Sequence, residues 1–257
     1  ADGSEASMCG NGLRGVARYV CEKLQVSEAL IETMKANLKV KKEQPLFKQL
    51  PTYSVEISPV SFALSSLPMW YKNQEAILNE VIEAFSPTIQ FTAVSVPNPH
   101  LIGIVNDYYI KHQSHQFLLA QYLNNENEYC AEGVNVSYVY PMTDDSIYVR
   151  TYERGVGFTN ACGTAMTASA LVANLNGIVK SNIVTVYNPG GFVKCVIDKE
   201  DSGYKLLLIG NATIKQLYSL KVIDDSFEWI HCESTGEQVE YEECIKFVEQ
   251  QINPYLK

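Results

Sequence analysis

The sequence lacks the patterns that mark disulfide frameworks, zinc ribbons and membrane spans. Its seven cysteines are an odd number without a CxxC pair, and it has only four histidines. It contains no apolar run of membrane-spanning length, no signal-peptide pattern, and no Walker A or GxSxG sequence. These absences favour a protein of the reducing cytosol over a secreted or membrane-embedded one.

Positive charge is also scarce. The chain has 20 Lys and Arg against 29 Asp and Glu, a net charge of −9, without a Lys/Arg cluster. This balance argues against nucleic acid or an anionic membrane as the partner. The 257 residues are 46% hydrophobic and 19% charged, which is typical of a globular protein with one large domain or two small ones. Ala1 is no natural initiator, so we expect the natural chain to extend before it.

One local pattern occurs twice. Cys9-Gly10 precedes a small-residue, apolar run with helical periodicity over 10–24, and Cys162-Gly163 precedes a second run that ends at Asn176-Gly177. A thiol at a helix N-terminus lies at the positive end of the helix dipole, which favours its thiolate form. Two such thiols, one in each half of the chain, suggest a two-sided acid/base site.

Inverting a carbon centre without a cofactor needs a base on one face and a proton donor on the other. A thiolate/thiol pair at Cys9 and Cys162 can supply both. The helix N-terminal N–H groups can hold the adjacent carboxylate, at Gly10 and Asn11 on one side and Gly163 and Thr164 on the other. The simpler alternative is two buried structural cysteines.

Four polar residues could bind the rest of a zwitterionic substrate. Arg154 could clamp a carboxylate, and Glu153 could face an ammonium group. Asn98 and Asn135 could add hydrogen-bond donors. The simpler alternative is a solvated ion pair and two turn asparagines.

Two further motifs offer alternative sites. Gly10-x-Gly12-x-x-Gly15 matches a dinucleotide fingerprint, but polar residues rather than a strand precede it. His112-x-x-His115 could hold a metal on one helix face, but no acidic or cysteine ligand lies nearby in the sequence. We therefore expect no metal and no cofactor.

The remaining patterns predict strands that do not alternate regularly with helices. We expect two further helices, over 74–85 and 240–252. The predicted strands lie within 38–63, 92–96, 101–105, 134–140, 146–152, 184–187, 192–197, 206–209 and 214–222. This arrangement indicates an α+β fold, and the repeated Cys-Gly unit suggests two equivalent domains, each with strands around a central helix.

Two blocks of the sequence resemble the cysteine motifs of the diaminopimelate epimerase family. The first runs from Ala1 to Val20 and the second from Tyr152 to Thr164. Weaker blocks follow in the family's order, so the resemblance covers about residues 1–222. They lie at 55–62, 98–100, 133–136, 188–191 and 208–212.

The resemblance implies two pseudosymmetric domains facing a cleft, each a curved, mostly antiparallel sheet or barrel around a central helix. Residues 1–53 would be the remainder of the first domain, after several tens of residues that the family has before Ala1. Residues 54–206 would form the second domain. Residues 207–222 would return to the first domain as a strand, and 223–257 would be a C-terminal extension with a helix.

The resemblance also implies a reaction and its residues. Cys9 and Cys162 would interconvert LL- and meso-diaminopimelate as an acid/base pair, without pyridoxal phosphate or metal, for lysine and peptidoglycan precursors in the cytoplasm. The partner would be this small amino acid, with a homodimer as one possible assembly. A racemase of another amino acid, or a catalytically incomplete binding fragment, are the alternatives. The implied α-carboxylate ligands are Gly10, Asn11, Gly163 and Thr164, and the implied ligands of the distal end are Asn98, Asn135, Glu153 and Arg154.

Overall fold

The computed structural model describes residues 8–33, 36–201, 203–224 and 226–256. Within these ranges no helix has the length and apolar character needed to cross a bilayer. The helices are α1 (Gly10–Leu24), α2 (Asp107–Lys111), α3 (Ser114–Asn124), α4 (Gly163–Leu175) and α5 (Glu237–Leu256), with a 3₁₀ turn η1 at Leu64–Ser66. The strands are β1 (Glu28–Glu32), β2 (Asn37–Glu43), β3 (Thr52–Ile57), β4 (Glu80–Val81), β5 (Gln90–Ser95), β6 (Pro99–Ile104), β7 (Asn135–Thr143), β8 (Ser146–Glu153), β9 (Gly157–Thr159), β10 (Ile183–Asn188), β11 (Gly191–Glu200), β12 (Gly203–Asn211), β13 (Gln216–Ile223) and β14 (Ser226–Ser234).

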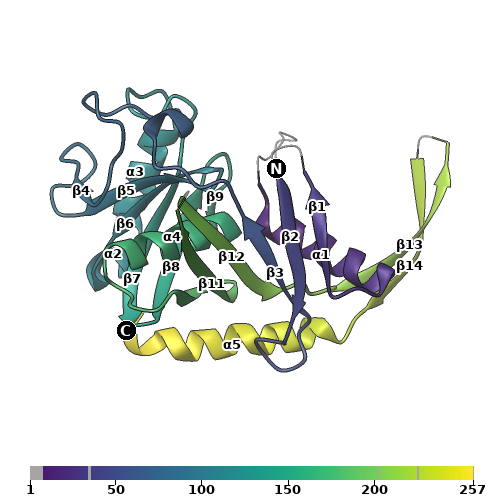
Figure 1. Cartoon of the computed structure of the whole chain (residues 1–257). Helices are drawn as coiled ribbons and strands as arrows, with labels where there is room; N and C mark the ends of the chain where they lie inside the picture. The colour runs from purple at the N-terminus through teal and green to yellow at the C-terminus, as the bar shows by residue number, and fades with distance from the viewer. Residues whose placement is uncertain (1–7, 34–35, 202, 225, 257) are drawn as a thin grey trace.

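Most strands belong to one large, curved sheet (Figure 1). Its strand order is β1-β2-β3-β12-β11-β10-β8-β7-β6-β5-β4, with β9 paired to β8. The pairs β6–β7 and β8–β10 are parallel, and the other pairs along this path are antiparallel. The predicted α+β class is therefore confirmed. The division into domains at 53, 206 and 222 stays a prediction.

The helix that follows each Cys-Gly pair, α1 or α4, packs inside the curve of the sheet. Helix α1 contacts β1, β2 and β3, whereas α4 contacts β5 to β8 and β10 to β12. Every residue from Gly163 to Ala173 is buried, because small side chains such as Ala165 and Ala168 let the strands approach α4 closely. One hydrophobic cluster joins both helices to the strands around them.

In the second half of the chain, α2, α3 and an irregular segment that precedes β5 cover the face of the sheet opposite to α4. The helix predicted over 74–85 is wrong, because these residues form no helix. Asn79 has a φ of 53°, and the carbonyl of Ile77 accepts a hydrogen bond from the N–H of Ala93 in β5. Ile77 and Phe85 are still buried, so their apolar spacing serves packing against the sheet rather than helix formation.

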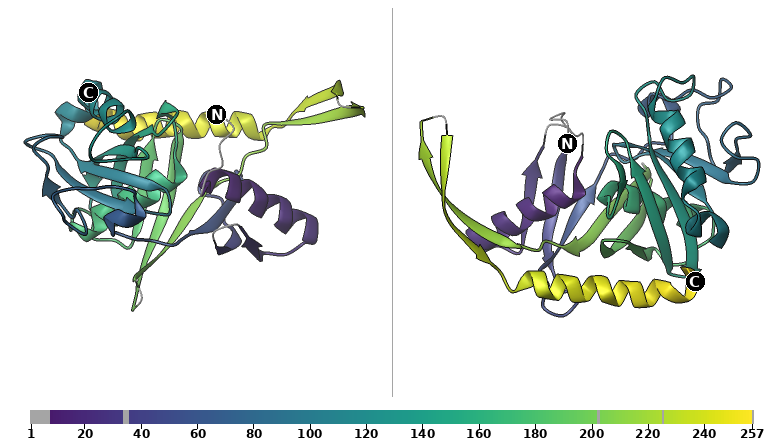
Figure 2. Two further views of the ribbon diagram at one scale, coloured as in Figure 1. Left: turned by 90° about the horizontal axis from the view of Figure 1, so that it is seen from above. Right: turned by 180° about the vertical axis from the view of Figure 1, so that it is seen from behind.

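The last sixth of the chain forms a hairpin and a long helix. Strands β13 and β14 pair only with each other and extend away from the body (Figures 1 and 2). All described side chains of this hairpin are exposed. The sequence predicted β13 but not β14. The helix predicted over 240–252 is confirmed as α5, which begins three residues earlier and ends four residues later.

Helix α5 runs beneath both halves of the molecule and contacts each of them (Figure 1). At its first residue, Glu237 accepts two hydrogen bonds of 2.7 Å from the guanidinium of Arg18 on α1. One turn later, the hydroxyl of Tyr241 donates to the carbonyl of Gly190, between β10 and β11, at 2.7 Å. The helix therefore ties α1 to the second half.

Replacing Glu237 with Gln tests this connection. The hydrogen bonds from Arg18 lower the pKa of Glu237 below its ordinary value of 4.5, so the carboxylate stabilises the fold above that pH and loses this effect as the pH falls. We expect E237Q to lower the free energy of unfolding at pH 7 by about 1–3 kcal/mol and to weaken the acid dependence of stability. Denaturant unfolding at pH 7 and pH 4 measures both. E242Q is the matched control on the exposed side of α5, and equal losses in the two variants would contradict this role.

Candidate active site

The N-termini of α1 and α4 meet between the two halves. A methyl group on Gly163 would lie 3.3 Å from the Cα of Gly10 and 2.9 Å from Cδ2 of Leu208 in β12. Each cysteine immediately precedes one of these glycines. Because consecutive Cα atoms are about 3.8 Å apart, the Cα atoms of Cys9 and Cys162 are separated by no more than about 13 Å. A methyl group at either glycine would crowd Leu208, and at Gly163 it would also crowd the backbone of Gly10, so glycine suits this approach of the two helices.

Both cysteines are the N-cap residues of their helices. Each has the extended backbone typical of an N-cap, with φ −135° at Cys9 and −127° at Cys162. The sulfur of Cys9 accepts a hydrogen bond from the N–H of Gly12 at 3.4 Å, and its side chain is exposed. The sulfur of Cys162 lies 3.6 Å from the hydroxyl of Thr164. The predicted helix N-terminal geometry of both thiols is therefore observed.

The environment of Cys162 favours the neutral thiol. Burial raises its pKa to about 12, with a further contribution from the negative charge of Glu153. The hydroxyl of Thr164 acts in the opposite direction, but more weakly. Cys162 is therefore protonated throughout the neutral range and suited to donate a proton.

Asn98 connects the two helix ends. Its side-chain amide donates to the carbonyl of Met8, just before Cys9, at 3.0 Å, and to the hydroxyl of Thr164 on α4 at 3.3 Å. This asparagine was predicted to bind substrate, and the structure gives it a position that spans both halves. The observed bonds make it a link between the two cysteine-bearing turns.

Asn135 and Arg154 lie together at the start of β7 and the end of β8. The side chain of Asn135 accepts a hydrogen bond from the backbone N–H of Arg154 at 2.9 Å and donates to the carbonyl of Pro99 at 2.9 Å. The Arg154 guanidinium donates to the carbonyl of Glu132 at 2.8 Å. Glu153, next in the chain, accepts from the hydroxyl of Thr159. Four polar residues predicted as ligands, Asn98, Asn135, Glu153 and Arg154, thus gather on the Cys162 side of the helix junction.

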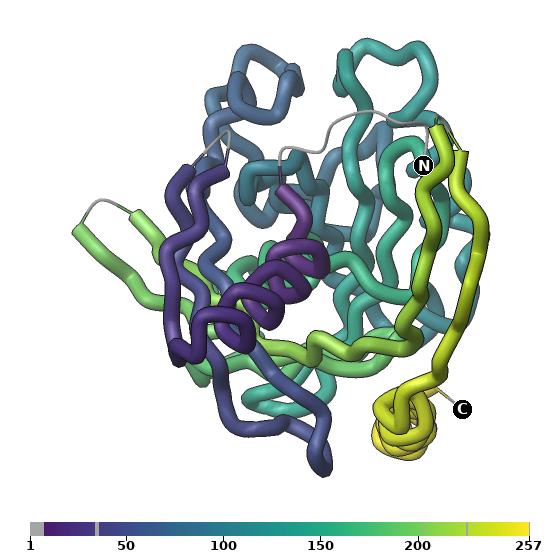
Figure 3. Tube along the Cα trace, turned by 90° about the vertical axis from the view of Figure 1, so that its right-hand side faces the viewer, coloured from purple at the N-terminus to yellow at the C-terminus, as the bar shows by residue number. Residues whose placement is uncertain are grey.

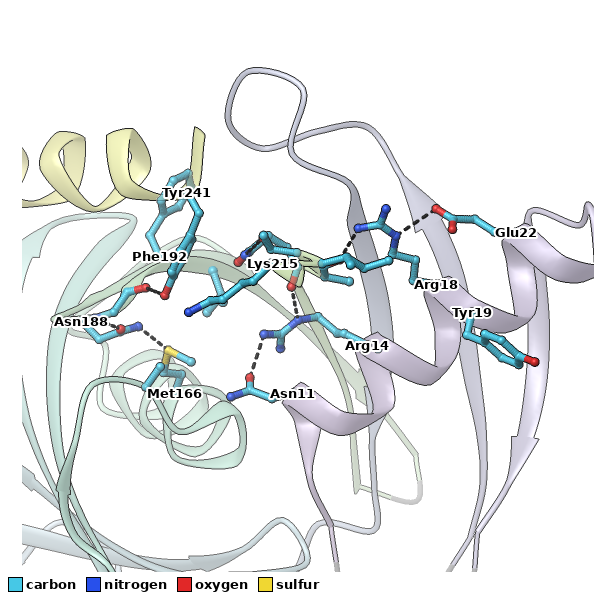
Figure 4. Close-up of a pocket in the computed structure, with 18 of the residues that line it drawn as sticks. Asn11, Arg14, Arg18, Tyr19, Glu22, Met166, Asn188, Phe192, Lys215 and Tyr241 are labelled. Carbon is cyan, nitrogen blue, oxygen red and sulfur yellow. Dashed lines mark hydrogen bonds and ion pairs between the residues drawn. The ribbon is translucent and has the colours of Figure 1, made fainter. Parts of the chain in front are cut away.

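A cavity of about 740 Å³ lies beside the helix junction, between α1, α5 and the turn after β10 (Figure 4). Asn11, two residues after Cys9, and Ala161, just before Cys162, belong to its wall, but the two thiols do not. Arg14 points into it from α1, and Tyr241 borders it from α5 (Figure 4). In a view along the molecule, α1 lies between the strands β1 and β2 and the hairpin β13–β14 (Figure 3).

The alternative motifs do not form the sites that they could have indicated. Gly10, Gly12 and Gly15 all lie within α1. His112 follows the end of α2 and His115 lies in α3, so they share no helix face. The described part of the chain holds no group of three or more His, Cys, Asp or Glu residues that could bind a metal ion. Residues 1–7 of the first sequence block lie outside the described residues.

Two residues at the junction were not predicted as part of the site. Cδ2 of Leu208 lies close to both glycines, within 3 Å of where a methyl group on either would be, and only its place in a weak sequence block pointed to it. Arg14 is buried one turn after Cys9 and donates to the side chain of Asn11 at 2.7 Å. The sequence did contain a signal for Arg14: it lies four residues after Gly10, which places both residues on one face of the helix.

Solved structures of other proteins resemble this fold. A PhzF-family phenazine biosynthesis protein from Bacillus anthracis superposes with a TM-score of 0.53 at 12% identity, covering 91% of this chain and 77% of that one. A probable proline racemase from Agrobacterium radiobacter K84 gives a TM-score of 0.51 at 12% identity, over 79% of this chain and 65% of that one. At such identities the similarity concerns the fold alone. The molecule thus has the fold found in this group of proteins.

Sequence relatives identify the family. The diaminopimelate epimerase family model matches residues 92–215. A diaminopimelate epimerase of Listeria monocytogenes serotype 4b is 49% identical over 253 residues, which is 97% of this chain and 76% of the relative. One of Enterococcus faecalis is 47% identical over 256 residues, with coverages of 97% and 78%. The chain is an isomerase, and it belongs to the diaminopimelate epimerase family.

The close contact of the two helices can be tested with matched glycine substitutions. In Gly163→Ala the new methyl group meets the backbone of Gly10 and the buried Leu208, so we expect the free energy of unfolding to fall by about 1–3 kcal/mol. In Gly15→Ala no atom lies within 4 Å of the new methyl group, so alanine should stabilise α1 by about 0.5–1 kcal/mol. Thermal and urea unfolding of both variants measure the difference. A stabilised G163A protein would contradict the described junction.

Proposed function

We propose that this protein interconverts LL- and meso-diaminopimelate with Cys9 and Cys162 as its acid/base pair. The observation that carries the proposal is the junction of the two helices, each of which begins just after one of these cysteines. The sequence relatives support the substrate, because those cited above are diaminopimelate epimerases.

The two thiols have different starting roles. Cys9, which is exposed and accepts a hydrogen bond from the N–H of Gly12, acts as the base that removes the α-proton. Cys162, with its raised pKa, serves as the thiol that gives a proton to the opposite face. One S–H bond forms at Cys9 as the C–H bond breaks, and a new C–H bond forms as Cys162 loses its proton. The reverse reaction exchanges these roles.

The electron pair left on the α-carbon is delocalised into the adjacent carboxylate. The free N–H groups at the starts of α1 and α4, at Gly10, Asn11, Gly163 and Thr164, bind this carboxylate and stabilise its growing negative charge. No resident cofactor or metal is needed for this step. The distal amino-acid end of the substrate is bound on the side of Asn98, Asn135, Glu153 and Arg154.

The reaction belongs to the formation of lysine and peptidoglycan precursors, in the cytoplasm, and we expect a homodimer. Light scattering coupled to size-exclusion chromatography measures the assembly. Turnover of diaminopimelate, compared with alanine and proline, separates the proposed substrate from the alternative of another amino-acid racemase. Binding of diaminopimelate in calorimetry without turnover would instead support a catalytically incomplete protein.

Serine variants of the cysteines test the mechanism. Loss of either thiol removes one side of the acid/base pair, so C9S and C162S should each lower epimerisation by about 100-fold or more. Deuterium incorporation at the α-carbon in D₂O, followed by NMR or mass spectrometry, measures each proton transfer. C232S removes an exposed thiol on β14 and is the matched control, which should keep wild-type turnover. Undiminished exchange in both C9S and C162S would exclude the two-thiol mechanism.

A further inference from the structure

Arg14 is a charged side chain in the interior of the molecule, one turn after Cys9. It is 6% exposed, and burial lowers the pKa of its guanidinium to about 10. Among the described residues no carboxylate forms an ion pair with it. A buried charge without a counter-ion is unfavourable for folding, so a requirement other than stability accounts for it better.

The hydrogen bonds of Arg14 converge on the first turn of α1. Its Nη2 donates to Oδ1 of Asn11 at 2.7 Å, and its Nη1 lies 3.5 Å from the carbonyl of Gly10. Its Nε donates to the carbonyl of Asn211, at the end of β12, at 2.9 Å. The guanidinium lies against Gly210, where a methyl group would be 3.3 Å from its Cζ. Arg14 thus fixes the turn after Cys9 to the sheet.

This arrangement determines which way the amide of Asn11 points. A guanidinium only donates hydrogen bonds, so it faces the oxygen of the Asn11 amide. The amide nitrogen, with its two N–H donors, is then turned away from Arg14. Asn11 is exposed and lines the cavity beside the helix junction, so these donors are available to a ligand that binds there.

The second half has a neutral group at the equivalent place. Thr167 is the fifth residue of α4, as Arg14 is the fifth of α1, and its hydroxyl donates to the carbonyl of Gly163 at 2.9 Å. Both side chains therefore bond to the first carbonyl of their helix. Only the first half adds a positive charge and an oriented amide.

We propose that Arg14 is a positioning residue that orients the amide of Asn11 as a donor to a carboxylate bound at the start of α1. This inference rests on the proposed function for the identity of that carboxylate. Independently of that identity, the Arg14 charge interacts with Cys9, so the proposal predicts that an anion is favoured over a neutral group beside Cys9.

Alkylation of Cys9 tests whether Arg14 favours an anion beside Cys9, without relying on turnover. Iodoacetate carries a carboxylate and iodoacetamide does not, and the ratio of their rates at Cys9 cancels changes in the thiolate fraction. We expect Arg14→Met to lower this ratio severalfold. Lys23→Met is the matched control, because Lys23 carries the same charge on the same helix, borders the same cavity and bonds to Tyr19 instead. Peptide mass spectrometry measures the rates, and circular dichroism checks the fold.

A double-mutant cycle with Asn11 distinguishes positioning from a purely structural role. In the wild-type background, R14M should lower kcat/KM for diaminopimelate by about 10- to 100-fold, mostly through KM. In the Asn11→Ala background the same change should have little further effect. If R14M does not fold, R14K, which keeps the charge but not the fork of donors, takes its place in both assays.

The outcomes are distinct. A ratio lowered by R14M but not by K23M, with a non-additive cycle, supports the proposal. Equal ratios in all proteins, equal decreases in R14M and K23M, or full additivity with N11A would overturn it. A wild-type protein that lacks turnover but keeps the Arg14-dependent alkylation ratio would contradict the proposed function and leave the role of Arg14 supported.

Discussion

The contact between Gly10 and Gly163 is the constraint on which the site depends. It joins the N-termini of two helices from distant parts of the chain and directs their free N–H groups to one region. Cys9 and Cys162, as the N-cap residues, are carried to that region by the same contact. A side chain at Gly163 would crowd the backbone of Gly10, and one at either glycine would crowd Leu208. The reactive geometry and the packing of the two halves therefore depend on the same contact.

The repeated Cys-Gly unit is equivalent in backbone but not in electrostatics. The first thiol is exposed and has the buried guanidinium of Arg14 behind its helix turn. Burial of the second thiol, and to a smaller extent the negative charge of Glu153, raise its pKa and keep it protonated. A two-sided proton transfer needs this kind of difference, because one group must begin as the base and the other as the acid. Helix α5 holds the two halves together, because Glu237 bonds to Arg18 on α1 and Tyr241 bonds to the carbonyl of Gly190 in the second half.

Sequence patterns predicted the elements that depend on interactions between residues close together in the chain. The two helices after the Cys-Gly pairs, the hairpin of β10 and β11, and α5 follow from periodicity and turn residues, and the structure has them. The segment 74–85 has helical spacing but pairs with β5 instead, because tertiary hydrogen bonds at Ile77 and Asn79 outweigh propensity. The role of Leu208 and the bonds of Arg14 to Asn211 depend on residues almost 200 positions apart, which no local pattern reveals. The roles of the predicted site residues stay predictions that rest on their observed proximity.

The most direct measurement of the central claim is a chemical bridge between the two thiols. Dibromobimane joins two cysteines only when both lie within its short reach. In a C232S background, which removes the exposed thiol of β14, the account predicts one bridged product that links the peptides of Cys9 and Cys162 in mass spectrometry. Prior saturation with diaminopimelate should suppress this product. Alkylation of Cys9 and Cys162 by separate reagent molecules, without a bridged product, would contradict the claim that both thiols face one shared site.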